Sequence, residues 1–253
     1  MDLMGMLGVG PLMFVGLAAA SFATSFFAIL TGAAGGLMLL AIMATVMPPA
    51  ALIPVHTVVQ LGTGVTRTWI LWRYVMRDTV LPFVIGAAIG AVAGAKVFVS
   101  LPLAGLQGIL GAFILVVTWM PNVGRIGAHN GRFAFLGFGT TFLGVFVSAT
   151  GTMLAPFVAS AAPDRRNHVA TLAALMTITH IAKLVAFGFI GFAIGRFVPL
   201  MAAMIAAASV GSWLGGRVLH RMAEQRFRLI FKLLLTALAL RLLWAAAAAL
   251  GWF

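Results

Sequence analysis

Apolar residues fill most of the chain in long runs, and glycine, proline or charged residues separate one run from the next. These separators divide the sequence into ten apolar segments, at residues 11–30, 34–47, 50–72, 79–99, 103–120, 133–148, 151–162, 167–189, 197–219 and 227–250. A membrane-spanning helix needs about 20 predominantly apolar residues, and most of the segments have this length. We therefore expect an all-α polytopic membrane protein with about eight to ten transmembrane segments.

Composition agrees with a chain whose solvent is lipid. Of the 253 residues, 63% are hydrophobic and 8% are charged, a balance foreign to water-soluble domains. Cysteine is absent, which excludes disulfides, thiolate metal sites and cysteine nucleophiles. The segments leave no room for a separate soluble domain.

Two of the segments are too short for a comfortable crossing of the bilayer. These are residues 34–47 and 151–162. Short apolar segments that begin at glycine-rich breaks are typical of the broken or re-entrant helices of secondary transporters. We expect each to form such a helix.

The basic residues gather in alternate connections between the segments. One side has Arg73, Arg77, Arg125, Arg132, Arg165, Arg166, Arg217, Arg221, Arg226 and Arg228, whereas the other has little beyond Lys96 and Arg196. The positive-inside rule makes the Arg-rich side cytoplasmic. This predicts a multi-pass protein of the bacterial inner membrane with both termini periplasmic. It also accounts for the net charge of +12 without a nucleic-acid partner.

The two halves of the sequence resemble each other. Gly35 and Arg67 match Gly151 and Lys183 at an offset of 116 residues, and the later pairs Gly90/Gly94 and Gly211/Gly215 match at an offset of 121 residues. The predicted organisation is a first transmembrane repeat at 1–120, a cytoplasmic linker at 121–132 and a second repeat at 133–253. Five segments per half, an odd number, would invert the second repeat relative to the first. Membrane helices also share glycine patterns by chance, and this alternative stays open.

The third segment carries a polar stripe. His56, Gln60, Thr63 and Arg67 follow one another at spacings of four, three and four residues, so they share one helical face. A cation buried in hydrocarbon costs about 2.5–3.5 kcal/mol even on the lenient insertion scale, and it normally faces a partner or an aqueous cavity. Alternatively, Arg67 reaches the nearby headgroups along its own long side chain.

The eighth segment repeats a cation with polar neighbours. Thr179, His180 and Lys183 share a face there, and neither of the two polar segments contains a carboxylate. The four acidic residues, Asp2, Asp78, Asp164 and Glu224, all fall at predicted ends or loops. Two cations without carboxylates suit a small anion, and the sequence predicts no metal site.

The glycine-rich breaks are further candidates for the anion site. Gly35 and Gly36 begin one short segment, and Gly151 and Thr152 begin the other. A helix N-terminus presents unpaired N–H groups and the positive end of the helix dipole. Tight helix packing is the alternative explanation for these small residues. We expect Gly90, Gly94, Gly211 and Gly215 to be packing residues only.

The motifs quoted so far resemble a known family. The starts Gly32-Ala33-Ala34-Gly35-Gly36-Leu37 and Ala149-Thr150-Gly151-Thr152-Met153 are each followed by a second cue, Pro48-Pro49 in the first half and Arg165-Arg166 in the second. With the later glycine pairs, this arrangement is similar to the sulfite exporter TauE/SafE family of bacterial membrane proteins. The resemblance implies export of sulfite, an organosulfonate or a related sulfur oxyanion.

The leading interpretation is therefore a secondary transporter that works by alternating access around a site between the two repeats. No G-x-x-x-x-G-K-[ST] motif for ATP is present, and we expect no cofactor. The alternatives are an anion importer, a membrane scaffold and an intramembrane enzyme that would use Ser148 with His180. The last lacks an orienting carboxylate, so we expect no catalytic residues. Whether His56 or His180 couples transport to protons, and whether the protein is a homodimer, stays open.

Overall fold

The computed structural model describes residues 9–31, 35–119, 132–148, 150–189, 191, 195–218 and 224–251, and across these ranges the secondary structure is helical. The α-helices in chain order are α2 (Pro11–Thr31), α3 (Gly35–Ala44), α4 (Pro49–Leu71), α5 (Arg77–Ser100), α6 (Leu103–Trp119), α7 (Arg132–Val147), α8 (Gly151–Ala161), α9 (Arg165–Phe189), α10 (Val198–Val218) and α11 (Glu224–Ala249). Short 3-10 turns precede α5 and α10, at Trp72–Tyr74 and Gly195–Phe197. Each α-helix begins and ends within a few residues of a predicted segment, so the predicted helices are confirmed.

Several helices are suited to a membrane. Within the described ranges, Arg77–Ser100, Arg166–Phe189 and Gly195–Gly215 are long and apolar enough to cross a bilayer, and shorter apolar helices accompany them. The prediction of an all-α polytopic membrane protein is confirmed. The helices α3 and α8 have 10 and 11 residues. At 1.5 Å per residue each covers roughly half of a hydrocarbon core about 30 Å thick.

Contacts divide the chain into two compact units. One holds Met1–Val59, Pro102–Trp119 and Ala193–Phe253, and the other holds Gln60–Leu101 and Met120–Phe192. Each unit takes segments from both predicted halves, and the boundary at Val59 falls inside α4. A division by contact is a different property from a repeat in sequence, so the predicted repeats stay a prediction. Of the predicted linker, residues 121–131 lie outside the described ranges.

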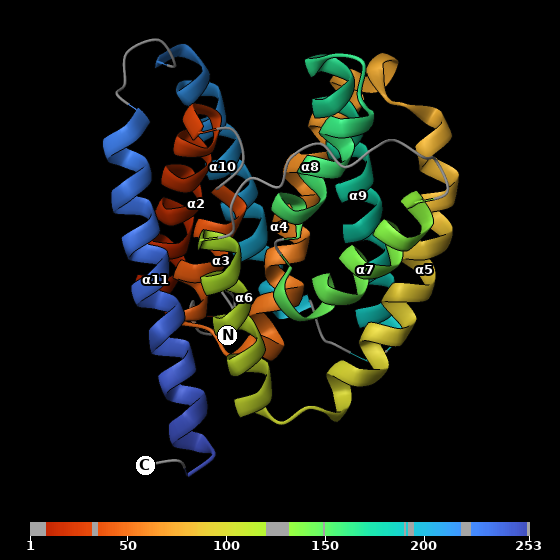
Figure 1. The fold of residues 1–253 in the computed structure, drawn as a ribbon. Helices are drawn as coiled ribbons and strands as arrows, with labels where there is room; N and C mark the ends of the chain where they lie inside the picture. The colour runs from red at the N-terminus through yellow and green to blue at the C-terminus, as the bar shows by residue number, and fades with distance from the viewer. Residues whose placement is uncertain are drawn as a thin grey trace. The chain divides into compact units, whose positions relative to one another are not determined.

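In the second unit, α5 packs along α7 through glycines (Figure 1). A methyl group added to Gly90 would overlap the carbonyl oxygen of Phe138, and one added to Gly94 would lie 3.0 Å from the carbonyl oxygen of Phe142. The two backbones can approach so closely because no side chain separates them. The packing role predicted for these two glycines is confirmed.

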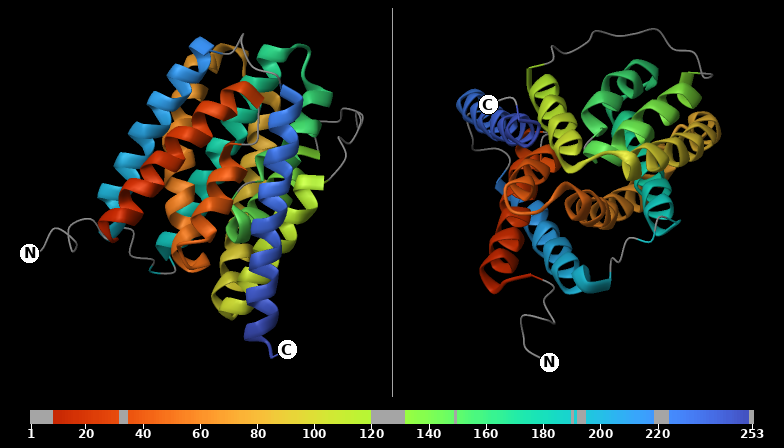
Figure 2. Two further views of the ribbon diagram at one scale, coloured as in Figure 1. Left: turned by 90° about the vertical axis from the view of Figure 1, so that its left-hand side faces the viewer. Right: turned by 90° about the horizontal axis from the view of Figure 1, so that it is seen from below.

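In the first unit, α2 packs along α10 in the same way, and the two helices run side by side (Figures 1 and 2). Methyl groups at Gly211 and Gly215 would overlap or crowd the carbonyl oxygens of Phe22 and Phe26. These contacts stand at the sequence offsets that relate the two halves, since Phe22 and Phe138 differ by 116 and Gly90 and Gly211 by 121. The packing role is confirmed here too.

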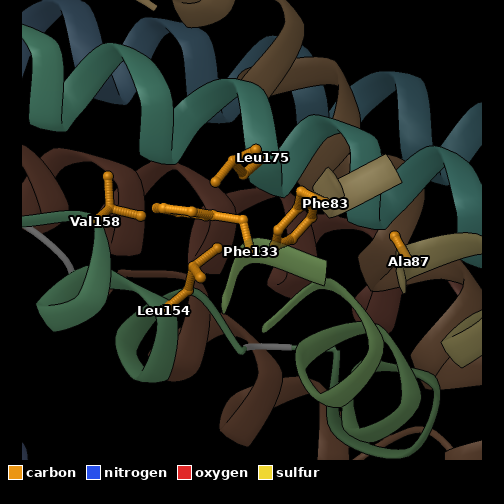
Figure 3. Packing of buried hydrophobic residues seen from close by; sticks show 6 residues of the cluster. All are labelled: Phe83, Ala87, Phe133, Leu154, Val158 and Leu175. Carbon is orange, nitrogen blue, oxygen red and sulfur yellow. The ribbon is translucent and has the colours of Figure 1, made fainter. Parts of the chain in front are cut away.

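An apolar cluster fixes α8 within the second unit. Its buried members are Phe83 and Ala87 from α5, Phe133 from α7, Leu154 and Val158 from α8 and Leu175 from α9 (Figure 3). Figure 3 shows Leu175 above the Phe133 side chain, Leu154 below it and Val158 beyond its left-hand end. The burial of one face of α8 sets the position of its N-terminus, where polar side chains gather.

Candidate anion site

Lys183 is a cation in the interior of the second unit. It lies on α9 with 0% of its surface exposed. Its Nζ donates hydrogen bonds to the carbonyl oxygen of Gly144 at 3.2 Å and to Oγ of Ser148 at 3.0 Å. Both acceptors are neutral. No described side chain therefore compensates the positive charge of the Lys183 ammonium group. This is unusual, because a buried charge is normally paired or neutralised.

The break between α7 and α8 brings Ser148 to the lysine. Ser148 has φ 56°, in the left-handed region, and it is buried. A non-glycine residue in this region costs about 1 kcal/mol or more. Its backbone N–H donates to the carbonyl oxygen of Gly144 at 2.9 Å, which closes the end of α7. Such strained positions cluster at binding and switch sites.

The N-terminus of α8 is uncapped. Thr150 stands at the N-cap position and makes no side-chain cap hydrogen bond. The N–H of Met153 already donates to the carbonyl oxygen of Thr150 at 3.1 Å. The N–H groups of Gly151 and Thr152 precede it and have no acceptor among the described residues, so they stay available to a ligand. Oγ1 of Thr150 and Oγ1 of Thr152 are also buried without a hydrogen-bond partner among the described residues. Helix N–H groups, hydroxyls and a cation together form a donor set for an anion.

Gly144 shows how close these groups are to one another. A methyl group built on Gly144 would lie 3.3 Å from Cδ of Lys183, 3.4 Å from Oγ1 of Thr150 and 3.7 Å from Cγ2 of Thr179. The three side chains therefore lie around one point beside Gly144. We call the set Gly144, Ser148, Thr150, Thr152 and Lys183 the α8 site.

Other predicted residues of the second half lie around this site. Oγ1 of Thr179 donates to the carbonyl oxygen of Leu175 at 3.0 Å, and it accepts a hydrogen bond from Thr141 at 3.5 Å. His180 is buried on the same helix. At Gly151 an added methyl group would lie 3.5 Å from Sδ of Met176, an ordinary contact. The thioether of Met176 thus covers the first residue of α8.

The predicted residues of the first half fall in two places. His56 is buried in the first unit, where its Nε2 donates to the carbonyl oxygen of Gly36, in the first turn of α3, at 2.9 Å. Gly35 is buried at the start of the same helix. Gln60 and Thr63 belong to the second unit, and Oγ1 of Thr63 donates to the carbonyl oxygen of Gln60 at 3.1 Å.

The predicted pairing of Arg67 with Lys183 stays a prediction, because the side chain of Arg67 lies outside the described part of the structure. The helix segment beside it does meet α9. Oγ1 of Thr68 lies 3.1 Å from Oγ1 of Thr177, with which it shares a hydrogen bond. The glycine-rich start at Gly32, Ala33 and Ala34 also lies outside the described residues.

The described carboxylates lie in exposed positions, unlike the buried Lys183. Asp78 and Asp164 are both exposed. Asp164 caps α9, because its Oδ1 accepts the backbone N–H of Asn167 at 2.8 Å. No group of three His, Cys, Asp or Glu residues suited to a metal ion occurs in the described ranges. The chemistry that the side chains of the α8 site offer is hydrogen-bond donation to an anion.

Three members of the α8 site were missing from the predicted set. The sequence marked Gly151 and Thr152 at the break but not Gly144 or Thr150, and it considered Ser148 only as a nucleophile. The sequence did contain a feature that could have marked Ser148 as part of the break between the two helices. At the offset of 116 residues it corresponds to Gly32, so a serine stands where the other half has the residue that tolerates a left-handed backbone.

A comparison with known families identifies the chain. The family model described as Sulfite exporter TauE/SafE matches residues 17–242, which is most of the sequence. The chain belongs to the sulfite exporter TauE/SafE family. The resemblance inferred from the glycine motifs is thereby confirmed. This is a family of transporters, so the chain is a membrane transporter and not an enzyme, and the alternative of an intramembrane enzyme is set aside. Searches of curated proteins and of solved structures found no match.

Proposed function

We propose that this TauE/SafE transporter exports a small sulfur oxyanion such as sulfite and binds it at the α8 site. The observation that carries the proposal is the buried Nζ of Lys183, which has two neutral hydrogen-bond acceptors and no described counter-charge. An anion would supply the missing charge. It would also accept from the N–H groups of Gly151 and Thr152 at the start of α8 and from the hydroxyls of Thr150 and Thr152, which have no hydrogen-bond partner among the described residues.

An oxyanion fits this donor set better than a metal ion or a proton-carrying cation would. Each oxygen of a sulfur oxyanion accepts several hydrogen bonds, and charge-assisted hydrogen bonds are about twice as strong as neutral ones. The site combines one ammonium group with the neutral hydroxyls of Thr150 and Thr152 and the N–H groups that begin α8. Together these groups can donate several hydrogen bonds to one oxyanion.

The energetics of export need no ATP. Movement of an anion out of a cell that is negative inside is favourable by about 2.3 kcal/mol per charge for each 100 mV. A secondary transporter without further coupling is sufficient for this direction. We propose alternating access between two inverted repeats as its mechanism, and the recurrence of the glycine contacts at matching offsets, such as Gly90 with Phe138 and Gly211 with Phe22, supports it.

We also propose that the Arg-rich ends face the cytoplasm of a bacterial inner membrane and that both termini are periplasmic. Support comes from contacts at one end of the second unit. Nη1 of Arg166 donates to the hydroxyl of Tyr74 at 3.2 Å, and Nδ2 of Asn167 donates to the carbonyl oxygen of Tyr74 at 2.9 Å. The connection that contains Arg73 and the start of α9 therefore lie at the same end, as the positive-inside rule requires of two cytoplasmic loops.

The test is efflux of labelled sulfite from proteoliposomes with an imposed membrane potential. We expect saturable efflux that rises with an inside-negative potential. Lys183→Gln should abolish it, because the variant keeps a hydrogen-bond donor but removes the charge. Lys96→Gln is the matched control, since Lys96 is an exposed lysine of α5 in the same unit.

Two outcomes would contradict the proposal. Efflux that survives in Lys183→Gln at the level of the Lys96→Gln control would exclude the α8 site as the anion site. Absence of sulfite efflux in a folded wild-type protein would instead exclude sulfite export itself. Thermal unfolding of each variant in detergent shows whether it is folded.

A further inference from the structure

The α8 site carries a single formal charge, and this sets the class of anion that it can hold. We infer that the site binds singly charged oxyanions and discriminates against doubly charged ones, an inference that rests on the proposed function. Within the described part of the chain, Lys183 is the only charged side chain of the set, and Gly144, Ser148, Thr150 and Thr152 are neutral. Thr179 and Thr141, which adjoin it, are neutral as well.

The helix ends add little net charge. The C-terminal turn of α7 supplies the Gly144 carbonyl oxygen that accepts from Nζ of Lys183, and α8 begins a few residues later at Gly151. A helix C-terminus carries roughly −0.5 and an N-terminus roughly +0.5 of an elementary charge. Because one end of each sign borders the site, the two contributions largely cancel. The charge available to a ligand remains that of one lysine.

Because the site is buried, its single positive charge should make it selective for the charge of the ligand. Lys183 has 0% of its surface exposed, so water does not compensate an excess charge there. A monoanion such as an alkanesulfonate or hydrogensulfite, the singly protonated form in which sulfite would be bound, would be neutralised. A dianion such as sulfate or fully deprotonated sulfite would leave one negative charge uncompensated. The insertion penalty of a single charge within a membrane corresponds to roughly a hundredfold in affinity. We therefore expect monoanions to bind roughly a hundredfold more tightly than dianions.

Methanesulfonate and sulfate are suitable probes, because both present a tetrahedral sulfur with three or more oxygens and differ in charge. Their binding to the full chain in detergent can be measured by titration calorimetry. We expect methanesulfonate to bind roughly a hundredfold more tightly than sulfate.

A second positive charge should remove the preference. Sδ of Met176 lies 3.5 Å from the point that a methyl group on Gly151 would occupy, and lysine has a similar length to methionine. We expect Met176→Lys to tighten sulfate binding at least tenfold, and Met176→Gln, the neutral control, to leave it unchanged.

The outcomes separate this inference from the proposed function. If sulfate binds as tightly as methanesulfonate in the wild type, a second cation such as Arg67 reaches the ligand, and the inference is overturned while the anion site stands. If neither probe binds the folded wild type, and Met176→Lys binds neither, both the inference and the proposed site fail. A hundredfold preference that Met176→Lys abolishes supports the inference.

Discussion

Nζ of Lys183 lies 3.0 Å from Oγ of Ser148, a residue held in the left-handed backbone region at φ 56°. The position of the cation thus depends on a backbone conformation that serine rarely adopts. The sequence offers glycine at the corresponding position of the first half, Gly32. A serine at this break therefore costs about 1 kcal/mol of conformational energy and supplies a hydrogen-bond acceptor for the lysine in return.

This relationship predicts different stabilities for two variants of Ser148. Ser148→Ala loses the hydroxyl and keeps the strained backbone, whereas Ser148→Gly loses the hydroxyl and relieves the strain. We expect the glycine variant to be more stable than the alanine variant by about 1 kcal/mol. Chemical unfolding of both variants in detergent measures the difference. Equal stabilities would show that Ser148 is not strained.

Lys183→Met should separate binding from stability. The change removes an uncompensated buried charge and keeps a side chain of similar length, and replacing buried charges by apolar groups is often neutral or stabilising. We expect sulfite binding to weaken more than tenfold while the free energy of unfolding is unchanged or higher. The Gly144 carbonyl oxygen keeps one donor in the variant, the N–H of Ser148. A variant that unfolds more easily but still binds sulfite would give Lys183 a structural role instead.

Gly144→Ala should narrow the α8 site. The new methyl group would lie 3.3 Å from Cδ of Lys183 and 3.4 Å from Oγ1 of Thr150, which are flexible or small side chains that can shift. We expect a folded protein in which sulfite binds several-fold more weakly, because the methyl group takes room between the two donors. Gly139→Ala is the control on the same helix, since nothing lies within 4 Å of its added methyl group. Equal binding in the two variants would contradict the prediction.

The glycine contacts between paired helices should be sensitive to a single methyl group. Gly90→Ala would force α5 away from the backbone of Phe138 in α7, and Gly211→Ala would force α10 away from Phe22 in α2. Overpacking of this kind costs about 1–3 kcal/mol. Both variants should unfold at a lower denaturant concentration than Gly16→Ala, whose added methyl group meets no atom within 4 Å. If only one of the two variants loses stability, the pair of helices in the other variant tolerates separation.

Asp164 should matter for stability and not for transport. Its Oδ1 caps α9 through the N–H of Asn167. Removal of an N-cap carboxylate costs about 1 kcal/mol, so Asp164→Ala should lower the free energy of unfolding by that amount. Sulfite efflux per folded molecule in proteoliposomes should stay at the wild-type rate. A large fall in efflux without a loss of stability would instead assign Asp164 to a substrate gate.

Much of the fold could be predicted because it follows from local rules. Segment length, apolar runs and the Gly and Pro separators are properties of neighbouring residues, so the helices α2 to α11 and the short lengths of α3 and α8 were predictable. The glycine pair at Gly90 and Gly94 was equally predictable, since a small-x-x-x-small spacing in an apolar helix indicates close packing.

The sequence by itself determined that this is a helical membrane protein of a transporter family, and it marked Lys183, Gly151 and Thr152 as residues of a candidate anion site. Only the tertiary structure decided which groups meet Lys183. The contacts with Gly144 and Ser148 join positions 39 and 35 residues away in sequence, and no periodicity along one helix encodes such a pairing. It arises because the apolar cluster around Leu154 and Leu175 fixes α8 and α9, and because the left-handed turn at Ser148 directs the chain from α7 back to the lysine.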